Sequence, residues 1–229
     1  MQEKANIGSL FDRIAGSYDR FNHVTSAGID LWWRKVAIKK LNHADKVLDV
    51  AIGTGDLAME AVRQNKAGHV TGLDLSREMM RIGAEKAKRA GMADKIDFCE
   101  GSALEMPYEN NVFDAVTCAY GIRNFSDLDK GLNEMHRVMK DGGQLVILEF
   151  SYPKNCVIRW GYNLYFTHIM PLLGKIISKE SSAYTYFLNS VKTFIWGDEM
   201  LQHLRDAGFS DAKFKTLTFG ITTLYTATK

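Results

Sequence analysis

Hydrophobic residues recur along this chain with two alternating periods. Short apolar runs typical of buried strands predict strands at 46–51, 69–74, 95–99, 113–119 and 143–150. Between them, apolar residues spaced three or four apart predict helices at 55–66, 76–90 and 127–140. Strands that alternate with helices of this length predict a doubly wound, mostly parallel α/β sheet with both faces covered.

The two ends of the chain depart from this alternation. Residues 1–43 predict N-terminal helices, with apolar stripes at Leu10, Phe11, Ile14, Tyr18 and Phe21 and at Leu31, Trp32, Val36 and Leu41. Residues 151–196 predict an aromatic-rich helical insertion. A helix at 198–207 is expected to stop at Gly208, a residue that favours helix C-termini. Two β-rich runs, 212–217 and 221–227, then predict a hairpin.

Together these elements predict one domain over 1–229. It would contain an N-terminal helical lid (1–43), a cofactor-binding core (44–150), a helical insertion that faces substrate or membrane (151–196), and a final helix and hairpin (197–229). A seven-stranded, mostly parallel sheet that ends in an antiparallel hairpin resembles the S-adenosylmethionine-dependent methyltransferase fold. It differs from an ordinary dinucleotide-binding sheet.

The stretch 47–58 carries the strongest chemical signal. A glycine turn at 53–55 joins a buried strand containing Asp49 to a helix that begins at Asp56, so free backbone N–H groups would face a ligand. The glycine spacing also fits a dinucleotide fingerprint. However, two unit charges about 4 Å apart repel by roughly 4 kcal/mol at an effective dielectric near 20, so these carboxylates disfavour a diphosphate. They favour a cofactor with an ammonium and a sulfonium, which S-adenosylmethionine has.

Two later strand ends add candidate cofactor contacts. Asp74 ends the second strand, where a carboxylate can accept hydrogen bonds from ribose hydroxyls, although such residues also cap helices. Ser102 follows a glycine after the third strand. In methyltransferases that resemble this chain, the residue at that place contacts adenine and is commonly Asp or Asn. Met79 and Met106 are candidate apolar walls or core residues.

Composition narrows the class of protein further. The net charge of +2 indicates no particular partner, and the absence of an Asn/Asp-Pro-Pro-Tyr-like run after the fourth strand speaks against a nucleic-acid amine as acceptor. The three cysteines are far apart, so we expect neither disulfides nor a metal site. No signal peptide or bilayer-spanning segment is visible, which predicts a cytoplasmic protein.

Several motifs together resemble the ubiquinone/menaquinone biosynthesis C-methyltransferase family. Residues 18–22 (YDRFN) with Ser26 and Trp33 are similar to one family signature, and residues 137–143 (RVMKDGG), continuing to 149–151 (EFS), are similar to the other. Residues 121–124 (GIRN) and 207–209 (AGF) also match, so the resemblance covers nearly the whole chain. The departures from the family pattern are Asp30 and Tyr225 where His is frequent, Asp141 where Pro is usual, and Ile52 where a small residue is common.

The resemblance implies S-adenosylmethionine as cofactor and methylation of a ring carbon on a prenylated quinol, either demethylmenaquinol or a methoxy-polyprenyl-benzoquinol. It implies catalytic roles for Arg123 and Asn124. The expected cofactor-binding residues are Tyr18, Asp49, Gly53, Thr54, Gly55, Asp74, Leu75, Met79, Ser102, Ala103 and Tyr120. A water or another side chain is expected to take the phenolic proton, since arginine does not readily lose its own.

Alternatives stay open at several positions. Arg123 could pair with Asp127 or Asp129, and Glu149 could bind substrate or orient Arg123. His23 could be a base or a structural residue, and His168 could face substrate. The rival functions are a small-molecule O- or N-methyltransferase and an NAD-dependent oxidoreductase.

A prenylated substrate also implies peripheral contact with the inner face of the membrane. The insertion offers Leu172, Leu173, Ile176 and Ile177 flanked by Lys154, Arg159, Lys175 and Lys179. A homo-oligomer is a further expectation.

Overall fold

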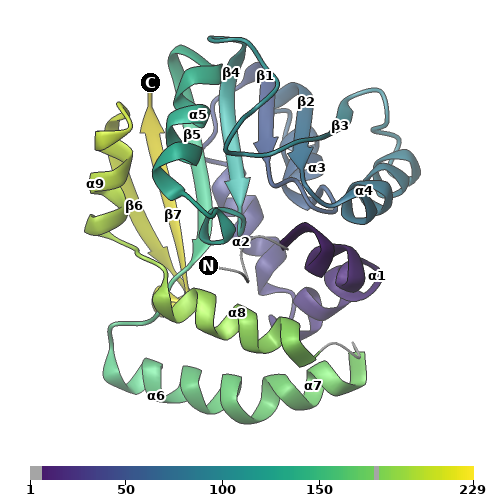
Figure 1. Ribbon diagram of the computed structural model, residues 1–229, viewed down its shortest axis with the longest axis vertical. Coiled ribbons are helices and arrows are strands. Elements are labelled where there is room, and N and C mark those ends of the chain that lie inside the picture. The colour runs from purple at the N-terminus through teal and green to yellow at the C-terminus, as the bar shows by residue number, and fades with distance from the viewer. Residues whose placement is uncertain (1–6, 178–180) are drawn as a thin grey trace.

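A computed structural model describes residues 7–177 and 181–229, with all side chains in this part except those of 174–185. One seven-stranded sheet runs through the molecule in the order β3-β2-β1-β4-β5-β7-β6 (Figure 1). Its strands are β1 (Ala44–Val50), β2 (Ala67–Asp74), β3 (Ile96–Glu100), β4 (Phe113–Ala119), β5 (Met139–Phe150), β6 (Ser210–Leu217) and β7 (Thr222–Thr228). The first five strands are parallel, and β7 is antiparallel to both β5 and β6. The predicted fold class is confirmed.

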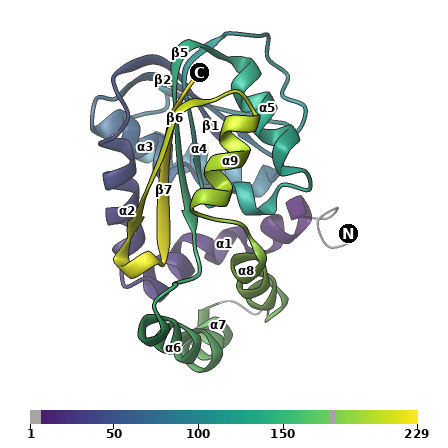
Figure 2. The same ribbon diagram turned by 90° about the vertical axis from the view of Figure 1, so that its left-hand side faces the viewer.

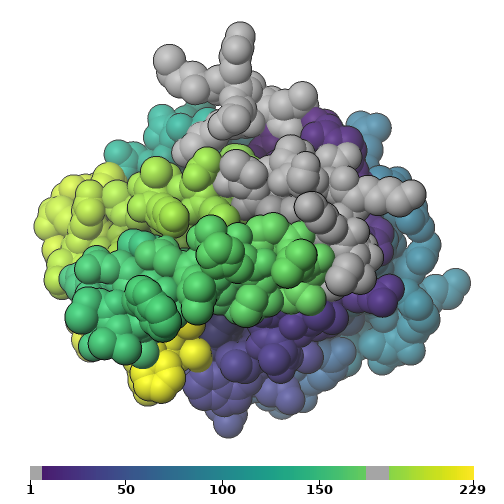
Figure 3. All heavy atoms as spheres, turned by 90° about the horizontal axis from the view of Figure 1, so that it is seen from below, coloured from purple at the N-terminus to yellow at the C-terminus, as the bar shows by residue number. Residues whose placement is uncertain are grey.

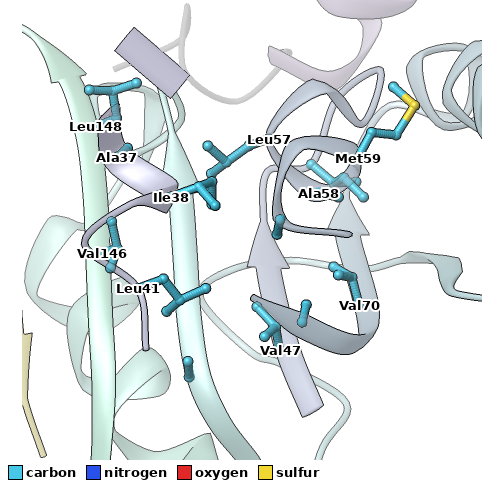
Figure 4. Close-up of a cluster of buried hydrophobic side chains, with 14 of the residues drawn as sticks. Ala37, Ile38, Leu41, Val47, Leu57, Ala58, Met59, Val70, Val146 and Leu148 are labelled. Carbon is cyan, nitrogen blue, oxygen red and sulfur yellow. The ribbon is translucent and has the colours of Figure 1, made fainter. Parts of the chain in front are cut away.

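Helices cover both faces of this sheet (Figure 2). One face carries α2 (Ile29–Ile38), α3 (Asp56–Arg63) and α4 (Arg77–Arg89), and the other carries α5 (Leu128–Val138) and α9 (Asp198–Asp206). Figure 4 shows the first core, where Ala37 and Ile38 of α2 and Leu57 of α3 meet strand residues such as Val47 and Val146. A second core lies between the opposite face of the sheet and helices α5 and α9. Full burial stabilises each Val, Leu or Ile side chain by about 1.5–3 kcal/mol, so the two cores hold the strand ends in fixed positions.

A layer of helices lies beyond the carboxyl ends of the parallel strands (Figure 1). It consists of α1 (Ile7–Thr25), α6 (Cys156–Leu164), η3 (Tyr165–Ile169), α7 (Met170–Ile177) and α8 (Ser181–Thr193). Tyr162, Phe166, Met170 and Val191 form a separate small core within this layer. Ligands of doubly wound sheets bind at this edge, so the layer covers the place where a site is expected. Two short 3₁₀ turns, η2 (Ile122–Asn124) and η4 (Thr218–Gly220), complete the same edge.

One predicted boundary was wrong. The helix expected at 127–140 ends at Val138, and β5 already begins at Met139 rather than at 143. Met139 pairs with Phe113 of β4, with a register shift before the next pair. Both Val138 and Met139 are fully buried, so the hydrophobic pattern carries no mark of the change from helix to strand.

The predicted apolar stripe of the second helix was only half right, because Leu41 is buried and Val36 packs against the core whereas the other two residues do not. Leu31 and Trp32 are 42% and 50% exposed. The buried residues of α2 are Asp30, Trp33, Arg34, Ala37 and Ile38. Nη1 of Arg34 donates to Oδ2 of Asp30 across 2.6 Å, and this pairing lets two charged residues occupy the inner face of the helix. Hydrophobicity therefore does not identify that face.

Candidate active site

Two adjoining cavities lie at the carboxyl edge of the sheet. The smaller cavity has a volume of about 160 Å³ and is lined by strand ends β1, β2 and β4, the segment 101–104 and the start of α1. It brings together these predicted cofactor residues: Tyr18, Gly53, Asp74, Leu75, Met79, Ser102, Ala103 and Tyr120. The predicted catalytic residue Asn124 lines it as well.

Asp74 connects the two loops that form the floor of the smaller cavity. Its Oδ2 accepts a 2.8 Å hydrogen bond from the backbone N–H of Gly53, and its Oδ1 accepts one of 2.8 Å from the N–H of Ser76. Burial raises the pKa of Asp74, and the backbone N–H groups act against that rise. Each carboxylate oxygen can accept a further hydrogen bond, so acceptors remain for two ribose hydroxyls.

The glycine turn leaves an open cradle beside Asp74. Gly53 has φ +56°, and a Cβ built there would meet no atom within 4 Å, so it would project into open space. Ala51 has a similar φ of +56° without being glycine. Because Gly53 has no side chain, a ligand can approach the main chain of the turn closely.

Three predicted cofactor residues do not line either cavity. Asp49 is buried and accepts a 2.7 Å hydrogen bond from the hydroxyl of Thr117. Burial raises the pKa of Asp49 to about 7, against the opposing effect of that hydrogen bond. The hydroxyl of Thr54 donates to Asp19 across 2.6 Å, and Gly55 precedes α3 with φ +81°. These residues support the turn from behind.

Asp56 does not face the cavities, contrary to the charge argument made from the sequence. Its carboxylate lies 2.6 Å from Nζ of Lys86 and 4.0 Å from Nη2 of Arg34. Burial acts to raise the pKa of Asp56, but the Arg34 and Lys86 charges outweigh it and hold that pKa below its ordinary value. Lys86 also lies 2.5 Å from Asp19, so this network ties α1 and α3 to α4.

The side of the smaller cavity formed by residues 101–104 and Met79 is mainly apolar. The hydroxyl of Ser102 accepts a 3.1 Å hydrogen bond from the backbone N–H of Leu104, which leaves its O–H available to donate. Met79 lines the cavity, whereas Met106 packs in the core behind it.

The larger cavity has a volume of about 340 Å³ and lies under the helical layer. The apolar stripe predicted at Leu10, Phe11, Ile14, Tyr18 and Phe21 lines it from α1. Phe150, Tyr162, Phe166 and Phe187 line it from the sheet and the insertion. Phe11, Tyr18 and Tyr120 belong to both cavities, so the two spaces meet at these rings.

Arg123 lies in the wall of the larger cavity. Its Nη1 donates to Oε1 of Glu149 across 2.7 Å and also to the carbonyl oxygen of Tyr120. The guanidinium carbon lies 5.4 Å from the ring centre of Phe150 and 5.3 Å from that of Phe187. Its Nε is buried and has no hydrogen-bond partner among the described residues. The guanidinium as a whole places a positive charge in the wall of the cavity.

The open question of the Arg123 partner is settled in favour of Glu149. Asp127 instead caps α5 by accepting from the N–H of Lys130, and Asp129 pairs with His203. Asn124 lies on the other side of the same turn, where its Oδ1 accepts a 3.0 Å hydrogen bond from the hydroxyl of Tyr186.

Two residues of the larger cavity were not predicted as site residues from the sequence. Arg34 lies 5.2 Å from the ring centre of Tyr120, and its partner Asp30 also lines the cavity. The sequence feature that could have identified Asp30 as a site residue is that an aspartate stands where the family frequently has a histidine. His23 bonds Asp30 across 2.9 Å, whereas His168 is exposed and lines neither cavity.

The chain has sequence relatives among known proteins. The sequence profile of the ubiE/COQ5 methyltransferase family matches residues 1–229. The chain is 44% identical to a demethylmenaquinone methyltransferase of Bacteroides fragilis, covering 100% of this chain and 94% of the relative. It is 41% identical to a ubiquinone/menaquinone biosynthesis C-methyltransferase, UbiE, of Geotalea daltonii, covering 97% and 96%.

Solved structures share the fold at low identity. The [4+2]-cyclase SpnF superposes with a TM-score of 0.74 at 17% identity, over 99% of this chain and 96% of that one. A SAM-dependent methyltransferase from Thermotoga maritima superposes with a TM-score of 0.67 at 18% identity, over 97% and 99%. One of these two proteins is titled a cyclase, so the fold by itself does not fix the reaction.

Proposed function

Since the chain belongs to the ubiE/COQ5 methyltransferase family, we propose that it methylates a ring carbon of a prenylated quinol in menaquinone biosynthesis. It is a methyltransferase, and S-adenosylmethionine is its methyl donor. The name of the Bacteroides relative favours a demethylmenaquinol as the acceptor, and that of the Geotalea relative extends the choice to a benzoquinol. The observation that carries the proposal is the full-length family match on a chain with two adjoining cavities of different character.

The smaller cavity fits S-adenosylmethionine. Asp74 would hold the ribose hydroxyls, the open turn at Gly53 would admit the ligand against the backbone, and Ser102 with Met79 would hold the adenine. Tyr18 would cover the cofactor from α1. The bound cofactor supplies an electrophilic methyl group on a sulfonium. Asp49, Thr54 and Gly55 would act indirectly, by fixing the turn.

The larger cavity fits the quinol ring and the first part of its isoprenoid tail, since its walls are mostly aromatic and aliphatic. A phenol has a pKa of about 10 and its ring carbon is a weak nucleophile until the hydroxyl loses its proton. The positive charge of the Arg123 guanidinium, in the wall of this cavity, would stabilise the oxygen as negative charge develops there. Glu149 would hold Arg123 in place, and Asn124 would hold the neighbouring turn.

Peripheral contact with the inner face of the membrane is part of the same proposal. No helix in the described part of the chain has the length and apolar character to cross a bilayer. Val157, Trp160, Leu164 and Leu172 nevertheless expose apolar side chains along α6 and α7. These two helices lie on the face seen in Figure 3. Lys154 and Arg159 are exposed near them, whereas the side chains of Lys175, Lys179, Ile176 and Ile177 lie outside the described ones. This face would deliver a lipid substrate to the larger cavity. The expected homo-oligomer is tested by light scattering.

The reaction is tested by supplying S-adenosylmethionine with a deuterated methyl group and a short-chain demethylmenaquinol in detergent. We expect a quinol whose label is attached to a ring carbon, located by NMR. A label on oxygen would support the rival O-methyltransferase function, and the absence of a labelled product with either quinol class would overturn the proposal. Calorimetry with NADH and S-adenosylmethionine separates the oxidoreductase alternative.

A further inference from the structure

Asp30 contributes a buried carboxylate to the wall of the larger cavity. Among the described residues that line this cavity, it is the only carboxylate, and none of them is a histidine. Its Oδ1 accepts a 2.7 Å hydrogen bond from the hydroxyl of Ser26, and its Oδ2 lies 2.6 Å from Nη1 of Arg34. The carboxylate is therefore fixed in position by the turn after α1 and by α2 while it forms part of the cavity wall.

His23 links the carboxylate of Asp30 to solvent. Its Nδ1 lies 2.9 Å from Oδ2 of Asp30. The side chain of His23 is 33% exposed, whereas that of Asp30 is 4% exposed. The two residues thus form a continuous polar path from the cavity to solvent, and either ring nitrogen of a histidine can carry a proton.

Other groups at the cavity are poorly suited to accept a proton. Burial raises the pKa of Tyr18, Tyr120 and Tyr162, so their hydroxyls stay protonated at neutral pH. Glu149 is engaged by Arg123 and does not line the cavity. The charged and titratable groups that act on the Asp30–His23 pair are Arg34, on the same helix as Asp30, together with Asp56 of α3 and Tyr120 after β4.

On the basis of the proposed function, we propose that Asp30 accepts the phenolic proton of the quinol and that His23 passes it to solvent. The O–H bond breaks toward Asp30, and the ring carbon forms a new bond to the methyl group while the methyl–sulfur bond breaks and its electrons stay on sulfur. The ring carbon then loses its own hydrogen as a proton, and the oxygen regains one. One proton leaves the site in each turnover, by way of His23.

The relay is tested with H23A and D30N, and with H69A as a matched control. His69 also bonds an aspartate, Asp97, across 2.9 Å, but this pair lies on the exposed surface of β2 and β3. General acid–base groups typically contribute about 10²–10⁴-fold, so D30N should lower kcat by about 100-fold or more. H23A should lower kcat by about 10-fold, within the smaller effect expected of a proton carrier, and added imidazole should restore it. H69A should match the wild type.

Thermal unfolding and calorimetric affinity for S-adenosylmethionine separate this role from a structural one. We expect both to be unchanged in H23A, so that the loss is confined to kcat. Wild-type kcat in H23A, or a loss that imidazole does not restore, would overturn the relay. If D30N fails to fold because Arg34 loses its partner, the H23A result decides. A wild-type protein that does not methylate any quinol would instead refute the proposed function.

Discussion

Nη1 of Arg123 lies 2.7 Å from Oε1 of Glu149, and the two side chains are only 5% and 1% exposed. The same carboxylate accepts a 3.2 Å hydrogen bond from the backbone N–H of Arg123 and a 2.8 Å bond from that of Phe150. Glu149 therefore holds both the side chain and the main chain of the residue expected to bind the quinol oxygen.

Replacement of Glu149 by Gln should destabilise the protein strongly. It would leave the Arg123 charge buried without a counter-charge, which typically costs about 3–5 kcal/mol. Urea unfolding at pH 7 measures this cost. Glu85→Gln is the control, because Glu85 pairs with Arg81 on the exposed surface of α4 and such pairs contribute about 0–1 kcal/mol. Equal losses in the two variants would contradict the buried role.

Replacement of Gly53 by Ala should weaken cofactor binding more than folding. A non-glycine residue in the left-handed region costs about 1–2 kcal/mol, and the new methyl group would also enter the smaller cavity. Gly142→Ala is the matched control, since Gly142 has φ +76° and equally open space but lies away from that cavity. We expect similar losses in unfolding free energy and a calorimetric loss of S-adenosylmethionine affinity in Gly53→Ala only.

Replacement of Asp74 by Asn should lower the affinity for S-adenosylmethionine. Both carboxylate oxygens of Asp74 accept hydrogen bonds from backbone N–H groups. The side-chain NH₂ of Asn would therefore face one of these backbone N–H groups, so that two donors would oppose each other. Hydrogen bonds to a charged group contribute about 1.5–3 kcal/mol, which corresponds to roughly a 10- to 150-fold weaker Kd by calorimetry. Asp97→Asn, on exposed β3, should bind as the wild type does. An unchanged Kd in Asp74→Asn would exclude the ribose role.

Asp49 should make stability fall as pH rises. Burial raises the pKa of Asp49 from about 3.8 to about 7, so between these values the native state holds a proton that the unfolded state has lost. Stability is then lost progressively up to pH 7, by an amount on the order of 4 kcal/mol. Urea unfolding at pH 5 and pH 8 should show Asp49→Asn gaining on the wild type at the higher pH.

Asp114 supplies the opposite control for this pH dependence. Its ion pair with Lys140 holds the pKa of Asp114 low despite the contrary effect of burial. Asp114→Asn should therefore lose stability relative to the wild type as pH rises through the range in which Asp114 ionises when unfolded. Parallel pH profiles for the two variants would contradict both assignments.

Replacement of Trp160 by Glu should weaken membrane association. Trp160 is 68% exposed on α6, where a carboxylate would oppose insertion into an anionic surface. Flotation with anionic vesicles should recover less of this variant than of the wild type. Trp160→Phe keeps the apolar contact and should float normally, and equal recovery of all three proteins would count against this face.

The sequence was sufficient for the main architecture because strand and helix periods are local properties. The glycine turn and Asp74 were found from their positions at strand ends, and the structure brings them to one cavity. The apolar stripe of α1 was also predicted, as part of an N-terminal helical lid, and all five of its residues line the larger cavity. Periodicity marks which residues avoid water and does not tell a protein core from a ligand pocket.

Charged residues account for most of what the sequence could not show. Asp30 and Arg34 neutralise each other inside the protein, so the buried face of α2 includes two charged residues that the predicted apolar stripe did not. Asp56 was expected to face the cofactor, but Lys86, 30 positions later, takes its charge. Such pairings depend on distances between separate elements, which no local pattern contains.

Phe11 and Tyr18 are walls of both cavities, and both residues belong to α1. On the proposed assignment of the two cavities, a ligand in one contacts side chains that also line the other, so the affinities for methyl donor and acceptor should be linked. Thermodynamic reciprocity then requires the donor to change acceptor affinity by the same factor as the acceptor changes donor affinity.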